Sequence, residues 1–339
     1  MNTSISRRGF LRQSFAFSAL AGLGSLPSLA KNFANGNASF NWLMIGDWGY
    51  ERPAGQEAVA EGMRSYVKQH AIKADALLML GDNWYGDLTG GVDSPRWKTH
   101  FEDLYPGSIF DCPAYAVLGN HDYQRMPMSK VDAELAYAKR GGTRWKMPAR
   151  WYSFEFPSKD PLVTVIALDS NVPHAKAPQA NSVNFTLTPE EQAEQLRWLK
   201  AELEKPRKTP YLIVIAHHPI YSNGPHGDHK VLIADWDPLL REHKAHLYLA
   251  GHDHDMQHLE FEGHPTSFVL SGGGGADLYT LKIEEAQRGP YAAKVYGFSH
   301  LQVAEDKLTL LHMDQTGRVI HGFTKTPDGK VDILQGIVA

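Results

Sequence analysis

Five short apolar runs of the sequence each end in side chains that can bind a metal ion. In chain order these ends are GDWG with Asp47, GDNWY with Asp82 and Tyr85, GNHD with Asn120 and His121, AHHP with His217, and GHDH with His252 and His254. A single Gly-Asp pair after a strand is usually only a turn, but five such ends in one chain are hard to explain as turns. Carboxylate, amide and imidazole groups together suit iron, manganese or zinc better than calcium or magnesium.

The supply of ligands fits two metal ions rather than one. One carboxylate can bridge two ions, and two ions about 3.5–4 Å apart can hold both oxygens of an in-line phosphoryl displacement. A glycine before a ligand lets the backbone turn sharply and approach the ion. Tyr85 is the unusual member, because a bulky phenol is a poor loop residue. A tyrosine packed on the rim is the simple alternative to a metal ligand there.

The apolar runs are expected to be strands that position these groups. Six runs recur, at residues 42–46, 76–81, 114–119, 163–168, 211–216 and 247–251. They are nearly continuous rather than alternating, which is typical of strands buried on both faces. In open α/β sheets, ligands collect outside the carboxyl ends of the strands. The polar groups at these ends should therefore lie close together.

Helices and a different sheet ending complete the predicted α/β architecture. Apolar residues have helical spacing over residues 56–70, and Thr188, Pro189 and Glu191 form the start of a helix that ends near Leu203. Three later segments, at residues 297–303, 307–313 and 319–324, are separated by turn residues and predict antiparallel strands. After residue 40 the sequence contains no linker, repeat or low-complexity stretch, which predicts a single domain.

The first residues are typical of an export signal. Arg7 and Arg8 form a twin-arginine pattern, an apolar stretch follows over residues 15–26, and small residues end at Ala30. We interpret residues 1–30 as a cleavable twin-arginine signal peptide, with an ordinary basic terminus as the alternative, and residues 31–339 as the catalytic domain. This predicts a periplasmic or secreted protein whose partner is the twin-arginine export machinery. The apolar stretch is too short for a stable membrane anchor.

Composition excludes several other classes. The 339 residues are 42% hydrophobic and 21% charged, which indicates a soluble globular protein. The formal net charge of −4 leaves no basic footprint for nucleic acid. Cys112 is the single cysteine, so no intrachain disulfide can form.

The ordered set of motifs resembles the calcineurin-like metallophosphoesterases, and among them the small purple acid phosphatases of the tartrate-resistant type. The resemblance extends over nearly the whole chain after the signal segment, and it implies a two-sheet β-sandwich flanked by helices, with metals at its edge. It also implies that a ferric ion is held by Asp47, Asp82, Tyr85 and His254. Asp82 would bridge to a divalent ion (iron, zinc or manganese) that is also held by Asn120, His217 and His252. His121 and His226 would face the phosphate and its leaving group.

Three positions depart from the family pattern. Ala216 replaces a common glycine, His218 replaces a residue that is often aromatic, and Tyr123 replaces a common histidine. His218 could lie behind a ligand or simply pack, and we favour packing. Trp48 and Trp84 flank ligands and are expected to wall the site. The remaining histidines of this part of the chain are expected at the surface or in packing, namely His229, His243, His246 and His258.

The predicted activity is hydrolysis of small phosphate monoesters by an exported acid phosphatase, in which a metal-bound hydroxide attacks phosphorus. One alternative is a phosphodiesterase that acts on nucleotides or phospholipid head groups with the same metals. A second is a non-catalytic protein that binds phosphate or metal.

Overall fold

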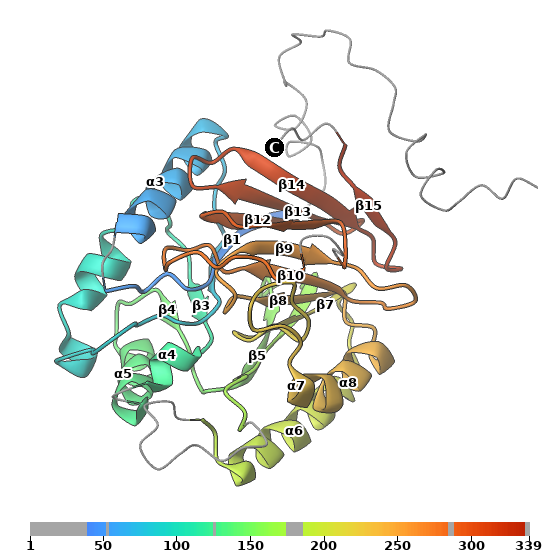
Figure 1. Cartoon of the computed structure of the whole chain (residues 1–339), viewed down its shortest axis with the longest axis horizontal. Coiled ribbons are helices and arrows are strands. Elements are labelled where there is room, and N and C mark those ends of the chain that lie inside the picture. The colour runs from blue at the N-terminus through green and yellow to red at the C-terminus, as the bar shows by residue number, and fades with distance from the viewer. Residues whose placement is uncertain (1–38, 52–53, 125–126, 174–185, 284–287, 336–339) are drawn as a thin grey trace, which may run out of the picture. The chain divides into compact units, whose positions relative to one another are not determined.

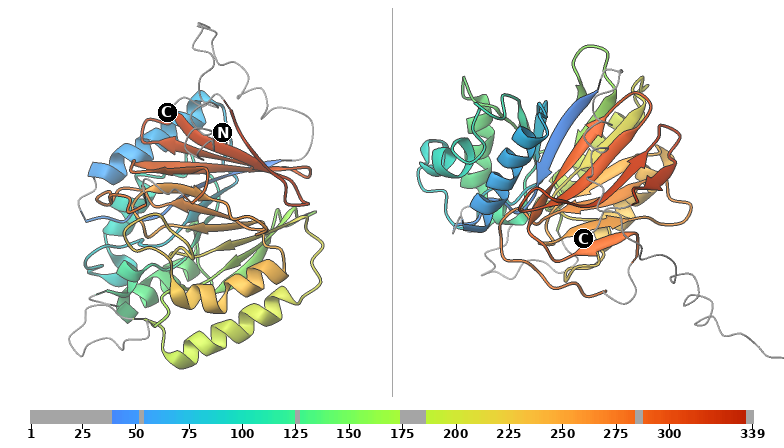
Figure 2. Two further views of the ribbon diagram at one scale, coloured as in Figure 1. Left: turned by 45° about the vertical axis from the view of Figure 1, so that its right-hand side comes forward. Right: turned by 90° about the horizontal axis from the view of Figure 1, so that it is seen from above.

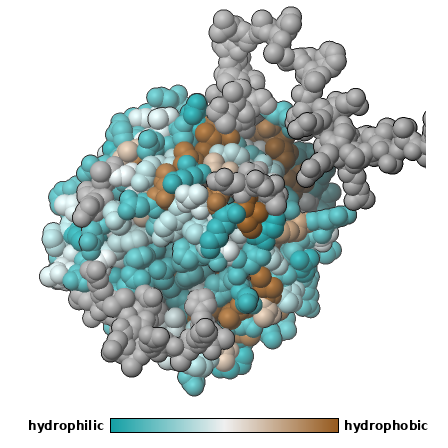
Figure 3. All heavy atoms as spheres, viewed as in Figure 1, coloured by the Kyte–Doolittle hydropathy of each residue, from teal (hydrophilic) through white to brown (hydrophobic). Residues whose placement is uncertain are grey.

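Two mixed β-sheets pack against each other and carry helices on their outer sides (Figures 1 and 2). The computed structural model describes residues 39–51, 54–124, 127–173, 186–283 and 288–335. The signal segment predicted over residues 1–30 lies outside these residues. The face drawn in Figure 3 is mostly hydrophilic, with smaller groups of apolar residues. Within the described part of the chain, no helix is both long enough and apolar enough to span a bilayer.

The first sheet joins a parallel half to an antiparallel half. Its order is β15-β14-β13-β12-β1-β2-β3-β4. The parallel strands are β1 (Phe40–Ile45), β2 (Ala76–Met79), β3 (Ala114–Ala116) and β4 (Trp145–Lys146). The antiparallel strands are β12 (Gly297–Val303), β13 (Leu308–Asp314), β14 (Val319–Lys325) and β15 (Val331–Ile333). The predicted antiparallel ending is therefore confirmed.

The second sheet has the order β11-β9-β10-β8-β7-β6-β5. Its parallel centre consists of β6 (Val163–Ala167), β7 (Tyr211–Ile215), β8 (Leu247–Ala250) and β10 (Ser267–Ser271). Its antiparallel members are β5 (Tyr152–Phe156), β9 (Met256–Leu259) and β11 (Tyr291–Ala293). All six predicted apolar runs are strands, and they divide equally between the two sheets. This confirms the predicted α/β fold class.

The two helices expected from the sequence are the longest of the described elements. They are α3 (Ala54–Gln69) and α6 (Pro189–Leu203). Thr188 caps α6, and its side chain and that of Glu191 form the predicted capping box. The shorter helices are α4 (Asn120–Tyr123), α5 (Pro127–Lys139), α7 (Lys230–Asp235) and α8 (Asp237–Glu242), with further helical turns at Gly91–Asp93 and Trp97–Glu102.

The two sheets meet at the edge where their parallel strands end. The backbone N–H of Gly46, after β1, donates to the carbonyl of Ser271 at the end of β10 over 2.7 Å. The N–H of Gly274 returns a hydrogen bond of 3.1 Å to the Gly46 carbonyl. These bonds join the first sheet to the second. The motifs that follow β1, β2 and β3 therefore face those that follow β7 and β8.

Candidate metal centre

The residues assigned to the ferric position converge. One ligand atom from each of Asp47, Asp82 and His254 lies within 4.8 Å of the others, and all three residues are buried. The Tyr85 hydroxyl lies 3.1 Å from Nε2 of His254 and 3.4 Å from Oδ1 of Asp47. Tyr85 is 5% exposed and its hydroxyl faces these groups, so it does not lie on an open rim.

The residues assigned to the divalent position form a second group beside the first. Nε2 of His217 lies 3.1 Å from Oδ1 of Asn120 and 3.3 Å from Nδ1 of His252. The same nitrogen lies 3.4 Å from Oδ1 of Asp82. Asp82 thus belongs to the first group and also contacts the second. This is the position that a bridging carboxylate requires.

Hydrogen bonds fix which nitrogen of each imidazole faces the site. Nδ1 of His217 lies 2.9 Å from the Leu80 carbonyl, and Nδ1 of His254 lies 2.7 Å from the Asp277 carbonyl. A carbonyl only accepts, so in both rings Nδ1 carries the proton and Nε2 presents a lone pair to the site. His252 differs, because its Nδ1 faces His217. All three rings can therefore bind a cation without a change of side-chain orientation.

The backbone at the ligands is held in an unusual conformation. Asp47, Asp82 and His252 have φ angles of 60°, 51° and 71°. Non-glycine residues rarely adopt such angles, which cost on the order of 1–3 kcal/mol each unless the surroundings enforce them. They place the three side chains at the ends of β1, β2 and β8, at the edge where the two sheets meet.

The glycines before the ligands leave room for other ligands. A Cβ on Gly119 would lie 2.2 Å from Oδ1 of Asp82, and one on Gly251 would lie 2.6 Å from Oδ2 of Asp47. Gly81 is constrained in two ways. Its φ is +87°, which favours glycine, and a Cβ would lie 2.6 Å from Nδ1 of His217. The glycines thus allow close packing of the ligand side chains, as well as a sharp turn.

The site concentrates buried groups whose pKa values are shifted by burial and by one another, and this arrangement suits cations. Burial disfavours the charged form of Asp82, yet His217 and His121 hold the pKa of its carboxyl well below the ordinary value. Burial likewise opposes a charge on His217, but the Asp82 and Asp47 carboxylates raise its pKa to about 9. Burial, with added repulsion from the same two carboxylates, raises the pKa of Tyr85 well above 10. Buried carboxylates, an amide, a phenol and imidazoles thus share one pocket, and this donor set fits a pair of transition-metal ions.

His121 and His226 lie on the open side of these groups. Both line a cavity of about 380 Å³ together with Asp82, Asn120, His252 and His254. The His121 ring lies 4.0 Å from the Tyr85 ring, and its backbone N–H donates to Oδ1 of Asp82 over 2.7 Å. The His226 ring lies 4.2 Å from the His252 ring. The structure therefore brings all nine sequence-predicted site residues to one place.

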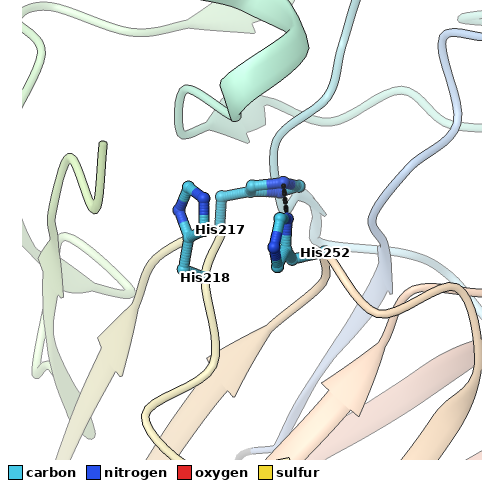
Figure 4. Close-up of side chains that lie close together, drawn as sticks. All are labelled: His217, His218 and His252. Atoms are coloured by element: carbon cyan, nitrogen blue, oxygen red, sulfur yellow. Dashed lines mark hydrogen bonds between the residues drawn. The ribbon is translucent and has the colours of Figure 1, made fainter. Parts of the chain in front are cut away.

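The His218 side chain lies next to the site and contacts it, rather than only packing in the core. One of its ring nitrogens is within 4.8 Å of ligand atoms of His217 and His252 (Figure 4). Its Nδ1 lies 2.8 Å from Oγ of Ser170, and its ring lines the cavity 4.2 Å from the ring of His252. Packing was the favoured expectation, but the position directly after a ligand can face either way, so the sequence alone could not decide.

Several residues near the motifs pack away from the cavity. The Tyr123 hydroxyl donates to Oδ2 of Asp169 over 2.6 Å, and this ring does not line the 380 Å³ cavity. Trp48 and Trp84 were expected to wall the site, but both are fully buried and their rings pack 5.7 Å apart. They are absent from the residues that line the cavity. That expectation was wrong, because the indole rings turn toward an aromatic cluster beneath the ligand loops.

Ala216, which also departs from the family pattern, and the four remaining histidines have structural roles. Ala216 is buried, and its N–H donates to the Leu249 carbonyl over 3.1 Å. His229 caps α7, since its Nδ1 accepts from the Leu232 N–H. His243 follows α8 and is partly exposed. His246 and His258 are buried. All three were expected at the surface or in packing.

Two aspartates inside the motifs were missed by sequence reasoning. Asp122 of GNHD accepts hydrogen bonds from the N–H groups of Gly119 (2.7 Å) and Trp84 (2.8 Å), and so joins two ligand loops. Asp253 of GHDH accepts from the His226 ring over 2.6 Å. The only hint in the sequence was the presence of an acid in each motif, which says nothing about its partner.

Residues 41–256 match the family model described as calcineurin-like phosphoesterase. The fold and the site define a metal-dependent phosphoesterase, and the chain belongs to the calcineurin-like phosphoesterase family, with purple acid phosphatases among its relatives. Purple acid phosphatase 7 of Arabidopsis thaliana is 30% identical over 329 residues, which cover 92% of this chain and 93% of the relative. Tartrate-resistant acid phosphatase type 5 of Mus musculus is 27% identical over 303 residues, which cover 83% and 88%. The family prediction is therefore confirmed.

Solved structures share the fold. GAP50, the anchor in the inner membrane complex of Plasmodium, is 22% identical with a TM-score of 0.71, over 84% of this chain and 87% of that one. Purple acid phosphatase PPD1 from yellow lupin (Lupinus luteus) is 16% identical with a TM-score of 0.61, over 86% of this chain and 54% of that one. At these identities the likeness concerns the fold alone.

Proposed function

We propose that this protein is an exported acid phosphatase that hydrolyses small phosphate monoesters at a binuclear metal centre. The observation that carries the proposal is the pair of ligand groups that share Asp82, with His121 and His226 on their open side. The acid phosphatases among the relatives support the same chemistry.

The chemistry of the ligands supports a ferric ion beside a divalent one. Asp47, Tyr85 and His254, with Asp82, would hold Fe(III), because a hard phenolate oxygen favours the ferric state. Asn120, His217 and His252, with Asp82, would hold iron, zinc or manganese in the divalent state. When bound, the two ions supply positive charge for the phosphoryl oxygens and an activated water. Two carboxylates and one phenolate offset only part of the five positive charges, so an anionic ester is attracted.

The chain's own residues handle the substrate on the open side of the ligands. His121 and His226 line the cavity and can donate hydrogen bonds or a proton to the leaving oxygen. Burial lowers the pKa of His121, although the Asp82 carboxylate acts in the opposite direction. The half-exposed His226 ring lines the same cavity.

Two measurements test this proposal together. Elemental analysis of protein purified without added metal should find two ions per chain, at least one of them iron. Turnover of p-nitrophenyl phosphate should exceed that of bis(p-nitrophenyl) phosphate. A preference for the diester would favour the phosphodiesterase alternative, and no hydrolysis of either ester by fully metallated protein would contradict an enzymatic role.

Export is the second part of the proposal, and the Arg7-Arg8 pair supports it. Twin-arginine export carries folded proteins, which suits a protein that takes up metal before it leaves the cytoplasm. Replacing both arginines by lysine should leave active precursor in the cytoplasm, as measured by cell fractionation. Normal export of that variant would contradict the assignment.

A further inference from the structure

Asp253 stands in the chain between the ligands His252 and His254, but its carboxylate contacts a different loop. The residue is fully buried. Its Oδ1 lies 2.6 Å from Nδ1 of His226, and the backbone N–H of His226 lies 3.4 Å from the same oxygen. The motif thus connects the metal ligands to the loop that carries a substrate-facing histidine.

The carboxylate is itself held in one orientation. Its Oδ2 accepts a hydrogen bond from Oγ of Ser222. The Ser222 oxygen accepts in turn from the Gly224 N–H (2.9 Å) and from Nε2 of Gln257 (3.0 Å). Both lone pairs of the hydroxyl are therefore used, and its proton has to point at Asp253. A Cβ on Gly224 would lie 2.4 Å from Cγ of Asp253, so the loop lies directly on the carboxylate.

This contact decides how the His226 ring is presented. The side chain is 46% exposed and sits on a loop, so few other contacts restrict its rotamer. The rings of His252 and Tyr279 are its aromatic neighbours, at 4.2 Å and 5.4 Å. Because Asp253 accepts only, Nδ1 of His226 carries a proton, and Nε2 remains for the cavity that the ring lines. An aspartate on the far nitrogen fixes both ring orientation and tautomer in catalytic triads.

We propose that Asp253 is a positioning residue that holds His226 with its Nε2 directed to the leaving oxygen of the substrate. The inference rests on the proposed function, in which His226 serves the leaving group. When the doubly protonated ring gives its Nε2 proton to the leaving oxygen, a neutral ring remains whose one proton is at Nδ1 and is donated to Asp253. If a donor faced Nδ1 instead, Nδ1 would carry no proton, and Nε2 would have to give up the only proton of the ring.

Asp253→Asn tests the inference because the environment of Ser222 dictates how the amide turns. The Ser222 hydroxyl has only a proton to offer, so the amide oxygen should face Ser222 and the amide NH₂ should face His226. Nδ1 of His226 must then accept, which reverses the tautomer. We expect kcat for phenyl phosphate, which has a poor leaving group, to fall by about 10–100-fold. For 2,4-dinitrophenyl phosphate, whose leaving group needs no proton, kcat should change by less than about 3-fold.

The double variant Asp253→Asn/Ser222→Ala provides the rescue. Removal of the hydroxyl lets the amide turn its oxygen to His226 and restore the original tautomer. We expect about a tenfold recovery of kcat for phenyl phosphate over Asp253→Asn. Ser222→Ala alone keeps the Asp253–His226 hydrogen bond and is the reference for this comparison. A double variant no more active than Asp253→Asn would overturn the orientation argument.

Metal content and a His226 variant separate the remaining explanations. Asp253→Asn should retain both ions in elemental analysis. Loss of metal with an equal fall for both esters would mean that Asp253 supports the ligands, and the inference would be wrong. His226→Ala should show the same dependence on the leaving group. If His226→Ala shows this dependence but Asp253→Asn matches the wild type, the positioning role of Asp253 is wrong and the proposed role of His226 stands. If His226→Ala shows no such dependence, the proposed role of His226 is wrong.

Discussion

Buried imidazoles of the first sheet should make the fold lose stability as the pH falls below neutral. His312 of β13 is fully buried. Its Nδ1 lies 2.7 Å from Oγ of Ser299 on β12, and its Nε2 lies 3.1 Å from the carbonyl of Gln257 on β9 of the other sheet. Burial lowers the pKa of His312 to about 3, and nearby His258 acts in the same direction. The other titratable groups beside it are Tyr291 and His321, whose rings are each 5.9 Å away.

The sign and size of the effect follow from the two pKa values. Unfolded histidine has a pKa of about 6.5, so below that pH the unfolded chain takes up a proton that folded His312 refuses. Its contribution is fully present above about pH 6.5 and is lost as the pH falls toward about 3. Between pH 7.5 and pH 5 the loss is about 2 kcal/mol. Burial also lowers the pKa of His300 to about 3, so the two residues together should cost about 4 kcal/mol. That is a large part of a typical stability of about 5–15 kcal/mol.

Urea unfolding of metal-free protein at pH 7.5 and pH 5 measures this directly. In His312→Gln, the free energy of unfolding should fall by about 2 kcal/mol less between the two pH values than in the wild type. Ser299→Ala is the matched control, because it removes a hydrogen-bond partner but keeps the imidazole. It should lower stability by about 1 kcal/mol at both pH values and keep the pH dependence of the wild type. If His312→Gln loses as much stability as the wild type, the buried imidazole is not the cause.

The remaining predictions concern the site. Asp82→Ala should lower the content of both ions, whereas His217→Ala should mainly deplete the divalent one; one ion per wild-type chain in elemental analysis would refute the two-ion arrangement. His121→Ala should keep both ions and lose about 10²–10⁴-fold in kcat, less for esters with good leaving groups, and an equal loss for all esters would indicate binding instead. Tyr85→Phe should abolish a visible charge-transfer band and weaken iron retention, with a stability change of about 1 kcal/mol, since only a hydroxyl is lost. Iron-loaded wild type without a visible band would leave Tyr85 as a packing residue.

The sequence predicted the strands and the place of the site because both depend on local pattern. Buried parallel strands appear in the sequence as apolar runs, and their carboxyl ends lie at one edge of a sheet. The prediction did not include the strands β4, β5, β9, β11 and β15 or the helices α4, α5, α7 and α8. Apart from α5, these elements have six residues or fewer, which is too short to establish a period. Helix α6 was predicted correctly because its capping box, formed by Thr188 and Glu191, is a local sequence signature.

What the sequence did not predict depends on contacts across the fold. Asp253 meets Ser222, which is 31 positions away in the chain, and no local pattern could indicate that pair. The Trp48 and Trp84 rings could turn toward the cavity or toward the core, and only the aromatic cluster beneath them decides the direction. His218 presents the same ambiguity, since adjacent residues at a strand end can face opposite ways. Motif spacing thus locates a site, while three-dimensional packing assigns the roles of residues around its ligands.

The backbone around the ligands indicates that the fold, rather than a bound ion, prepares the site. Asp47, Asp82 and His252 hold positive φ angles that cost on the order of 1–3 kcal/mol each. Hydrogen bonds within the fold oppose this cost: the Asp47 N–H donates to the Gly81 carbonyl over 3.1 Å, and the His252 N–H donates to Oδ2 of Asp47 over 2.8 Å. Asp47 and His252 are thus each tied to a neighbouring strand end by a bond that needs no metal. Because hydrogen bonds within the fold oppose the strain, the ligands would already be in place for an ion, and its binding energy would not be needed to order them.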